Sequence, residues 1–207
     1  MPAPGETFLW LLDAGALSEA VLGGYAAWLS ETERQRCARF VRPGRRRQFI
    51  AGRVLLRHAL GRLAGMAPRS IVLRERPGNA PALEMPDVAD LAFSISHSGP
   101  WVACAASSVC RIGLDIERID ARRDVLALAE QALGSDAVSE LHALEGEARV
   151  HAFHRMWCLH EAGIKLGGPG AAAYVFEHPG LSIALRAALA LPVAPVPAVV
   201  GLEELAR

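Results

Sequence analysis

The sequence predicts an α+β protein made of two halves of similar size. Helical and strand patterns follow one another in four groups, in the order helices, strands, helices and weaker strands. The two pairs of groups meet near Ser107–Arg111. A chain of 207 residues is long enough for one large or two small domains. We therefore expect a first half over residues 1–108 and a second half over residues 109–207.

Local signals define the elements of the first half. Ser30 and Glu33 have the spacing of a capping box, which predicts the start of a helix. Pro43 separates this helix from the next one, and Gly65 stands where the C-cap of that second helix is expected. In chain order we expect a strand at 7–12, helices at 30–40 and 45–64, and strands at 70–75, 91–95 and 101–106.

The second half is expected to begin with a strand and to continue with helices. Gly134 and the run Gly167–Pro169 each end a helical pattern. The tail from residue 187 is rich in Ala, Pro and Val and predicts no element before Leu202–Leu205. In chain order we expect a strand at 111–116, helices at 125–133, 136–144 and 147–166, and a strand pair near 173–176 and 181–186.

The composition excludes several classes of protein. The chain has 52% hydrophobic and 21% charged residues, which is typical of a soluble globular protein. Its 22 basic and 22 acidic residues give no net charge, so neither nucleic acid nor an anionic membrane is expected as a partner. No segment has the ~18 uncharged apolar residues that span a bilayer, and Asp13 interrupts the apolar N-terminal run, which argues against a signal peptide. The four cysteines form no C-x-x-C pair, so we expect free thiols in a cytoplasmic, monomeric protein.

Two carboxylates lie two positions apart at the end of the predicted strand 111–116. Side chains at i and i+2 of a strand point to one face, so Asp115 and Glu117 can converge on one cation. The alternative is that both face solvent and that Glu117 begins a charged loop. Like charges on one face repel unless a cation lies between them, and Gly113 permits a close backbone approach. We therefore interpret the pair as metal ligands.

A second set of functional residues lies on the predicted helix 147–166. Trp157, Glu161 and Lys165 follow one another at i, i+4 and i+8, which places them on one face. Lys165 is the only lysine of the chain. The alternative is an ordinary i,i+4 ion pair, worth about 0.2–0.5 kcal/mol. Gly163 costs the helix about 1 kcal/mol relative to alanine, which indicates close packing against another backbone or a ligand. Three carboxylates and an ammonium suit a divalent metal that holds a phosphate-bearing substrate.

The segment Phe93–Ser98 offers further polar groups. Ser96, His97 and Ser98 provide hydroxyl and imidazole groups that could contact a phosphate or a nucleotide. The alternative is a strand that ends in a polar turn. A G-x-S-x-G nucleophile elbow is excluded because His97 stands where that motif needs serine.

Arginines and histidines form two more groups. We expect most of the arginines to lie on a solvated helix face, while a subset could bind phosphate in a bidentate manner. His151, His154, Cys158 and His160 do not have zinc-site spacing, because Ile164 stands where H-E-x-x-H needs its second histidine. His151 and His154 are expected to be exposed. The clustered arginines are Arg42, Arg45, Arg46, Arg47, Arg53 and Arg57.

Taken together, these motifs resemble those of the surfactin-type 4′-phosphopantetheinyl transferases. The family pattern is G-x-D, followed after a gap by W-x-x-K-E-x-x-x-K. In this chain, Gly113-x-Asp115 is followed at a matching gap by Trp157-x-x-His160-Glu161-x-x-x-Lys165. Phe93–Ser98 is similar to the F-N-I-S-H-S segment of the family, and Leu29–Arg57 is similar to its N-terminal region. The resemblance spans roughly residues 8–185.

The resemblance implies both a fold and a reaction. The fold would be two similar α+β halves related by pseudo-twofold symmetry, with the active site at their interface and the metal-binding motifs in the second half. The reaction would move the 4′-phosphopantetheine of coenzyme A to a serine of an apo acyl or peptidyl carrier protein, with release of 3′,5′-ADP. It would serve polyketide, nonribosomal peptide or fatty acid biosynthesis.

The resemblance also implies roles for individual residues. Asp115, Glu117 and Glu161 would hold Mg²⁺, with Mn²⁺ as the alternative, on the pyrophosphate. Glu161, or a metal-bound water that it orients, would take the proton from the carrier serine, and Lys165 would contact the phosphate charge. Ser96 and His97 would hold the 3′-phosphate. The coenzyme A contacts implied are Ser96, His97, Arg46, Arg47, Arg53, His160 and Lys165.

The chain departs from the family pattern at three places. His160 replaces the lysine before Glu161, so one cation becomes pH-dependent. Asn79-Ala80 stands where a G-K-P segment would have its lysine, and the tail after about Leu185 does not match. We therefore predict weaker binding of coenzyme A. One alternative is a degenerate, non-catalytic relative that binds carrier domains or coenzyme A as an accessory module. Another is a metal-dependent phosphohydrolase, which explains the carboxylates but not the Ser-His-Ser segment.

Overall fold

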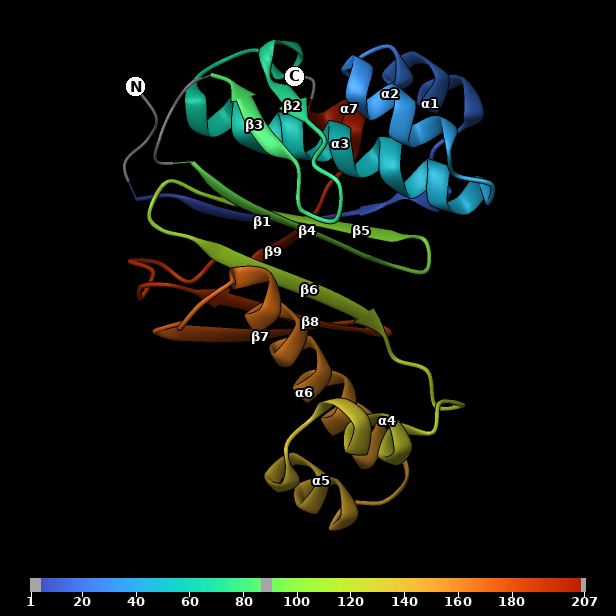
Figure 1. Cartoon of the computed structure of the whole chain (residues 1–207), viewed down its shortest axis with the longest axis vertical. Coiled ribbons are helices and arrows are strands. Elements are labelled where there is room, and N and C mark those ends of the chain that lie inside the picture. The colour runs from blue at the N-terminus through green and yellow to red at the C-terminus, as the bar shows by residue number, and fades with distance from the viewer. Residues whose placement is uncertain (1–4, 87–90, 206–207) are drawn as a thin grey trace.

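The computed structural model describes residues 5–86 and 91–205, which form two halves that lie against one another (Figure 1). The first half contains β1 (Thr7–Asp13), α1 (Glu19–Ala26), α2 (Glu31–Ala38), α3 (Pro43–Ala64), β2 (Val72–Arg74), β3 (Ala82–Met85), β4 (Ala92–Ser98) and β5 (Trp101–Ser107), with 3-10 turns at Ala14–Ala16 and Pro68–Ser70. The second half contains β6 (Ile112–Arg118), α4 (Val125–Ala132), α5 (Ser135–His142), α6 (Gly146–Leu166), β7 (Ala172–His178) and β8 (Leu181–Ala187). The chain ends with β9 (Pro197–Val199) and α7 (Leu202–Leu205).

The two halves share one topology, which confirms the predicted fold class. In each half a strand leads into helices, the last of which is long, and an antiparallel hairpin follows. The second strand of the hairpin lies in the middle of the sheet, so the order is β4-β5-β1 in the first half and β7-β8-β6 in the second. The first half differs by the separate two-stranded sheet of β2 and β3. The same strand–helix–hairpin unit therefore occurs twice, as pseudo-twofold symmetry requires.

Helix α3 is the central helix of the first half. Pro43 lies in its first turn, where a backbone N–H is not needed, so the proline begins the helix rather than separating it from the preceding one. Gly65 follows the last turn in the left-handed conformation, with φ of 66°, as the sequence predicts. Most residues from Phe49 to Leu63 are buried, because α3 packs on the sheet and is covered by the shorter helices.

The two sheets pack face to face between α3 and α6 (Figure 1). Side chains alternate along β1: Trp10 and Leu12 pack toward α3, whereas Leu9 and Leu11 pack toward the second sheet. The apolar core between the sheets is therefore continuous from one half to the other. Its further members include Ala103, Ala105, Ile112, Leu114, Ile116, Ile183 and Leu185.

The tail after residue 187 returns to the first half. Strand β9 pairs in parallel with β1, from Leu9 opposite Pro197 to Leu11 opposite Val199. Leu202 is buried in the core around α3. The boundary between residues 108 and 109 stays a prediction. Residues 197–205, which this boundary assigns to the second half, lie against the first half. In the part of the chain that the structure describes, no helix is long and apolar enough to cross a membrane.

The two strands that carry the motifs are longer than the sequence predicts. Strand β4 continues through Ser98 and β6 continues through Arg118, so the polar residues of both motifs lie in regular strands rather than in turns. Helix α1 and strand β3 were not predicted. Helix α1 contains two adjacent glycines, and β3 follows directly on the turn at 77–81, so neither has a clear local pattern.

The burial of one histidine differs from the prediction. His154 is buried, so the expectation that it is exposed is wrong. Its Nδ1 donates to the carbonyl of Val150 at 2.8 Å, and its Nε2 accepts from the backbone N–H of Asp120 at 3.4 Å. The ring thereby links α6 to the loop after β6. His151 is exposed and all four cysteines are free thiols, as the sequence predicts.

Gly113 sets the distance between β6 and α6. A Cβ atom at this position would lie 2.0 Å from the carbonyl oxygen of Ala162 and 2.5 Å from the nitrogen of Leu166. Only glycine therefore allows the strand to lie against the helix backbone. Gly163 is different, because a Cβ there would come no closer than 3.5 Å to a side-chain atom of Arg186. Gly163 therefore does not pack closely against another backbone, and the alternative that it packs against a ligand stays a prediction.

Replacing Gly113 with alanine should destabilise the protein strongly. Overpacking costs about 1–3 kcal/mol where the neighbours can shift, and here the neighbour is helix backbone. We therefore expect the free energy of unfolding, measured by urea denaturation, to fall by at least about 3 kcal/mol. Gly163→Ala is the matched control and should be neutral or stabilising by up to about 1 kcal/mol. Equal effects of the two substitutions would contradict the role assigned to Gly113.

Candidate functional site

Asp115 and Lys165 form the centre of the candidate site. Asp115 lies on β6 and Lys165 lies in the last turn of α6, with 2.7 Å between Nζ of the lysine and Oδ1 of the aspartate. The hydroxyl of Ser96, on β4, donates to the same Oδ1 at 2.8 Å and accepts from Lys165 at 3.0 Å. Elements from both halves therefore meet at one carboxylate oxygen.

The second oxygen of Asp115 lacks a hydrogen-bond partner in the part of the chain that the structure describes. Oδ2 is buried and has no hydrogen-bond partner among the described residues. Burying a carboxylate oxygen without a partner is costly, and a bound cation would supply the missing contact. Asp115 thus fits the role of metal ligand that the sequence predicts for it.

Glu117 lies two positions further along the same face of β6. Its Oε2 accepts from the hydroxyl of Ser98 at 2.9 Å, and Arg123 lies 3.9 Å away. The pKa of Glu117 is raised, mainly because burial disfavours its charged form. The hydrogen bond from Ser98 opposes this shift, and the negative charge of Asp115 adds to it. A cation between the two carboxylates would relieve their repulsion.

Glu161 lies on α6, one turn before Lys165, and is half-buried. Among the described residues, no three His, Cys, Asp or Glu side chains are grouped closely enough to form a metal site. The assignment of Asp115, Glu117 and Glu161 as metal ligands therefore stays a prediction. The unpartnered oxygen of Asp115 is the observation that favours it.

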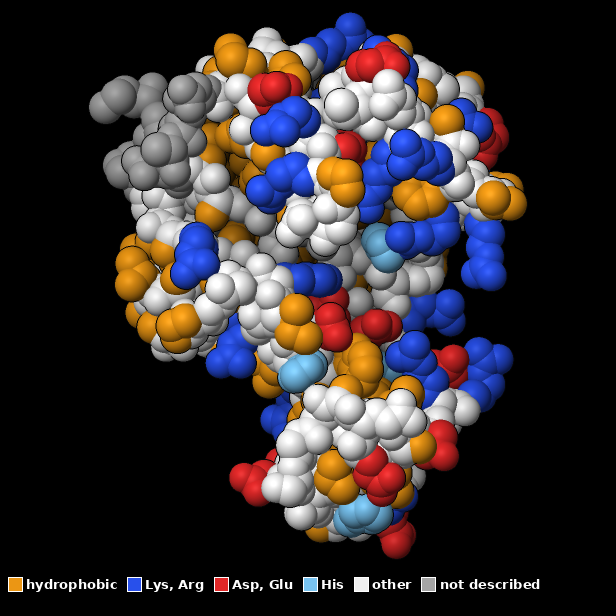
Figure 2. Space-filling view, viewed as in Figure 1, with side chains coloured by type: hydrophobic (Ala, Val, Ile, Leu, Met, Phe, Trp, Pro, Cys, Tyr) orange, Lys and Arg blue, Asp and Glu red, His pale blue; other side chains and the backbone are white. Residues whose placement is uncertain are grey.

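A cavity of about 650 Å³, which we call the basic cavity, lies between α3, β4 and the end of α6. On the face shown in Figure 2, Lys and Arg side chains surround a hollow on the side of α3, and acidic side chains lie directly below it. Several cations around one cavity suit a ligand that carries several phosphate groups. The basic side chains that line the cavity are Arg36, Arg45, Arg53, Arg76, His97 and Lys165.

Arg45 and His97 are in contact inside the basic cavity. Nη1 of Arg45 lies 2.8 Å from Nδ1 and 2.6 Å from Nε2 of the histidine. His97 faces the cavity and Ser96 faces β6, because successive side chains of a strand point to opposite faces. The pKa of His97 is lowered to about 4, mainly by burial and next by the positive charge of Arg45. The imidazole is therefore neutral at physiological pH.

Two arginines of the basic cavity already have a carboxylate partner. Glu75 accepts from Nη2 of Arg53 at 2.5 Å and from Nη1 of Arg36 at 2.5 Å. Arg45 donates to the side chain of Gln48, and Arg76 donates to the carbonyl of Ala80. Neither Arg45 nor Arg76 has an ion-pair partner within residues 5–86 and 91–205, so their charges remain available to an anionic ligand.

Four of the residues predicted to contact coenzyme A do not line the basic cavity, and one of them, Ser96, faces β6 instead. Arg47 donates to the carbonyl of Leu17 and pairs with Glu19 near α1. Arg46 lines separate hollows between α1, α2 and α3. His160 is exposed on α6. The structure does not bring Arg46 or Arg47 to His97, and their roles stay predictions.

Arg45 is the member of the arginine cluster that contacts His97. Arg45, Phe49 and Arg53 follow one another at i, i+4 and i+8 along α3 and share one face of the helix. Helical spacing could therefore have distinguished Arg45 from its two neighbours. Neither spacing nor composition indicated Arg76, which comes from the turn between β2 and β3.

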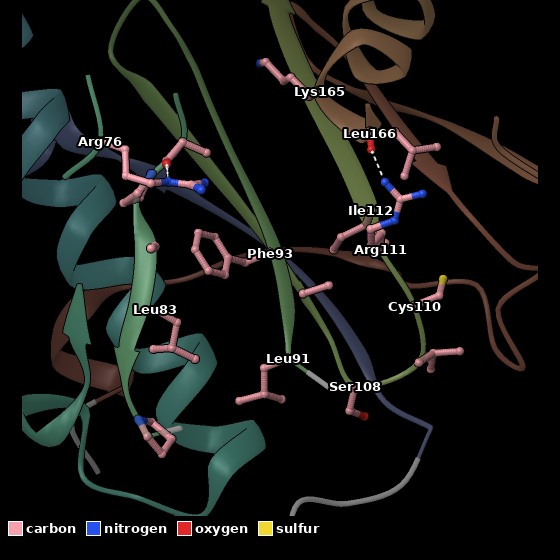
Figure 3. A pocket seen from close by; sticks show the side chains of 16 residues that line it. Arg76, Leu83, Leu91, Phe93, Ser108, Cys110, Arg111, Ile112, Lys165 and Leu166 are labelled. Carbon is pink, nitrogen blue, oxygen red and sulfur yellow. Dashed lines mark hydrogen bonds between the residues drawn. The ribbon is translucent and has the colours of Figure 1, made fainter. Parts of the chain in front are cut away.

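A second cavity of about 660 Å³, which we call the β3 cavity, continues from the basic cavity and shares Arg76, Phe93 and Lys165 with it. Its lining combines apolar side chains with polar atoms, and the polar atoms make up the larger part of the exposed wall. In Figure 3, Leu83 and Phe93 lie on one side of this cavity, and Ile112 and Arg111 lie on the other. Nη1 of Arg111 donates to the carbonyl of Leu166 at 3.3 Å, which fixes this wall to the end of α6.

Two family models match the chain. A model described as "4′-phosphopantetheinyl transferase, N-terminal" matches residues 18–109, and one described as "4′-phosphopantetheinyl transferase superfamily" matches residues 111–190. Together the two matches cover both halves of the fold.

Curated relatives carry the same description. The chain is 32% identical to the 4′-phosphopantetheinyl transferase HetI of Nostoc over 168 residues, which are 81% of this chain and 70% of HetI. It is 30% identical to the 4′-phosphopantetheinyl transferase Sfp of Bacillus subtilis over 146 residues, 70% of this chain and 63% of Sfp. It is 34% identical to the 4′-phosphopantetheinyl transferase AcpT of Escherichia coli over 127 residues, 61% of this chain and 60% of AcpT. The chain therefore spans between 60% and 70% of the length of these relatives.

The pKa of His97 should be near 4 in the ligand-free protein, as measured by NMR titration of its ring protons. Arg45→Gln should raise this pKa, because it removes the positive charge beside the ring. Arg46→Gln is the matched control and should leave the pKa unchanged, since Arg46 lines other hollows. Inorganic phosphate bound in the cavity should raise the wild-type pKa, because an anion favours the imidazolium.

The same shift predicts how stability depends on pH. The unfolded chain binds the proton near the ordinary histidine pKa of 6.5, whereas folded His97 binds it only near 4. His97 therefore makes the protein progressively less stable as the pH falls from about 6.5 to about 4. His97→Gln should remove this part of the pH dependence of unfolding. An unchanged pH dependence would contradict the lowered pKa.

Proposed function

Since the chain belongs to the 4′-phosphopantetheinyl transferase superfamily, we propose that it transfers the phosphopantetheine group of coenzyme A to a carrier protein. The acceptor is a serine of an apo acyl or peptidyl carrier protein, and the leaving product is 3′,5′-ADP. The observation that carries the proposal is the position of Lys165, which lines the basic cavity and contacts Asp115. Phosphate groups bound in that cavity would lie next to the carboxylates.

The basic cavity supplies the contacts for the phosphates of coenzyme A. Arg45 and Arg76 have charges that no described carboxylate neutralises, and His97 gains a proton more readily once an anion lies beside it. Lys165 is 30% exposed at its side chain, so its ammonium can contact a phosphate oxygen while it remains close to Asp115. The β3 cavity suits the rest of the same molecule, because it continues from the basic cavity.

Asp115, Glu117 and Glu161 are the residues that would hold Mg²⁺, and Mn²⁺ is the alternative. A divalent cation supplies neutralisation of the pyrophosphate charge that grows as the phosphoanhydride bond breaks. Carboxylate oxygens are the ligands that a hard cation prefers, and the unpartnered oxygen of Asp115 is the observation that supports the proposal.

The chain's own residues then perform the proton transfer and the charge stabilisation. Glu161 accepts the proton of the carrier serine as the serine oxygen forms its bond to the β-phosphorus of coenzyme A. The bond from that phosphorus to the bridging oxygen breaks, and the oxygen leaves on 3′,5′-ADP. Lys165 stabilises the negative charge on the phosphates during this exchange. Phosphoryl transfer depends on positioning and charge stabilisation more than on a strong nucleophile.

The direct test is incubation of the protein with coenzyme A, Mg²⁺ and an apo carrier protein, with the carrier's mass as the readout. Glu161→Gln should lower kcat by about 100-fold or more, because the general base is lost. Glu147→Gln, at the exposed N-terminus of the same helix, is the control and should transfer at the wild-type rate. Full activity of Glu161→Gln would remove the role assigned to this residue.

Failure of the wild-type protein to modify any of several carriers would reject the transferase activity. If the protein bound a carrier or coenzyme A without turnover, the accessory-module alternative would replace it. The replacement of the family lysine by His160 and the absence of a lysine at Asn79 are the features that favour this alternative.

Restoring the family lysine should strengthen coenzyme A binding. His160→Lys adds a charge that persists at pH 8, where imidazole groups are mostly neutral. We expect the KM for coenzyme A at pH 8 to fall by about two- to fivefold, as for a solvent-exposed ion pair. His151→Lys, on an exposed position of the same helix, should leave the KM unchanged. A KM lowered equally by both substitutions would indicate a general charge effect instead.

A further inference from the structure

Three serines of β4 form a regular ladder with β6. Each side-chain oxygen accepts a hydrogen bond from a backbone N–H group of β6, and each rung joins residues that are 20 positions apart in the sequence. The rungs connect the two halves of the molecule. They run from Leu114 to Ser94 at 2.9 Å, from Ile116 to Ser96 at 3.3 Å, and from Arg118 to Ser98 at 2.9 Å.

The ladder supplies hydrogen-bond acceptors for the unpaired backbone N–H groups of an edge strand. Strand β6 is the edge strand of the second sheet and β4 is an edge strand of the first. N–H groups of an edge strand that is buried against another layer need acceptors, and the hydroxyl groups provide them. The backbone of β4 is already paired with β5, so side chains make the connection between the sheets.

Two of the three hydroxyl groups also donate to a carboxylate of the candidate site. Ser96 donates to Oδ1 of Asp115 at 2.8 Å, and Ser98 donates to Oε2 of Glu117 at 2.9 Å, both across 19 positions. The same register brings Ser94 opposite Gly113, which has no side chain to receive a hydrogen bond. The spacing of the serines therefore matches the spacing of the carboxylates.

Each serine holds one oxygen of its carboxylate, and the other oxygen has no hydrogen-bond partner among the described residues. Oδ2 of Asp115 is buried without a partner, and no described residue donates a hydrogen bond to Oε1 of Glu117. Ligating carboxylates in proteins are commonly oriented in this way by an outer hydrogen bond. The ladder thus fixes the direction in which two adjacent carboxylates present a free oxygen.

We infer that Ser96 and Ser98 are positioning residues that hold Asp115 and Glu117 for a divalent cation. The inference rests on the proposed function, because that function requires the cation. The serines belong to the first half and the carboxylates to the second. The cation site therefore depends on the contact between β4 and β6, and β4 also forms part of the wall of the basic cavity.

Ser98 is the better position for a test, because Ser96 also contacts Lys165. The experiment measures the dissociation constant of Mn²⁺ for the full chain by the electron paramagnetic resonance signal of the unbound ion. Ser98→Ala should weaken Mn²⁺ binding about tenfold or more, as for other outer-shell partners of metal ligands. Ser98→Thr keeps the hydroxyl at a half-exposed position and should restore wild-type binding.

Ser94→Ala is the matched control. It removes the same kind of rung, since Ser94 accepts from a backbone N–H but has no carboxylate partner. Its loss of stability to urea should be similar to that of Ser98→Ala, whereas its Mn²⁺ affinity should be unchanged. Hydrogen exchange of the backbone amides of Leu114 and Arg118 should confirm that each substitution removed its own rung.

Three results would overturn the inference. These are wild-type protein that does not bind Mn²⁺, equal weakening in Ser94→Ala and Ser98→Ala, and failure of Ser98→Thr to restore binding. Failure of the proposed function has a different signature. A protein that binds Mn²⁺ in a Ser98-dependent manner but transfers no phosphopantetheine would reject the transferase activity and leave the positioning role intact.

Discussion

The close contact of β6 with α6 is the constraint on which the rest of the site depends. Gly113 allows the strand backbone to touch the helix backbone, because any Cβ atom there would overlap Ala162 and Leu166. Two residues further along, Asp115 reaches Lys165 on the same helix at 2.7 Å. Along the edge of β6 that is not paired with β8, the serines of β4 accept hydrogen bonds from its backbone. A wider strand–helix distance would separate the carboxylate from the ammonium and open the site.

The site has two neighbouring regions of opposite charge, the carboxylates Asp115 and Glu117 and the basic cavity. Lys165 belongs to both. Buried carboxylates form structural ion pairs with some of the arginines: Glu33 pairs with Arg57 at 2.5 Å, and Glu75 pairs with Arg53. Such buried pairs keep α2, α3 and the end of β2 together, and breaking one would leave an uncompensated charge. Arg45 and Arg76, which have no carboxylate partner among the described residues, are the ones that we propose as contacts of an anionic ligand. The same residue type therefore stabilises the packing of the first half and, in our proposal, binds the ligand.

Much of the fold could be predicted from local patterns. The capping box at Ser30, the C-cap at Gly65 and the strand–helix order were sufficient for the two-half architecture. The patterns failed where the determining contact is distant in sequence. Strand β9 is defined by its pairing with β1, and His154 is buried by the loop at Asp120, which no local period indicates.

The sequence by itself determined the order of the elements, the shared face of Asp115 and Glu117, and the spacing of Glu161 and Lys165, because strand and helix periods follow from covalent geometry. Only the tertiary structure decided what each face meets. It turned Ser96 toward Asp115 rather than into the cavity with His97, and it brought Arg45 rather than Arg46 to that histidine. The helix or strand repeat specifies on which face of its own element a side chain lies. Which residue the side chain contacts there depends on how elements distant in the sequence pack together.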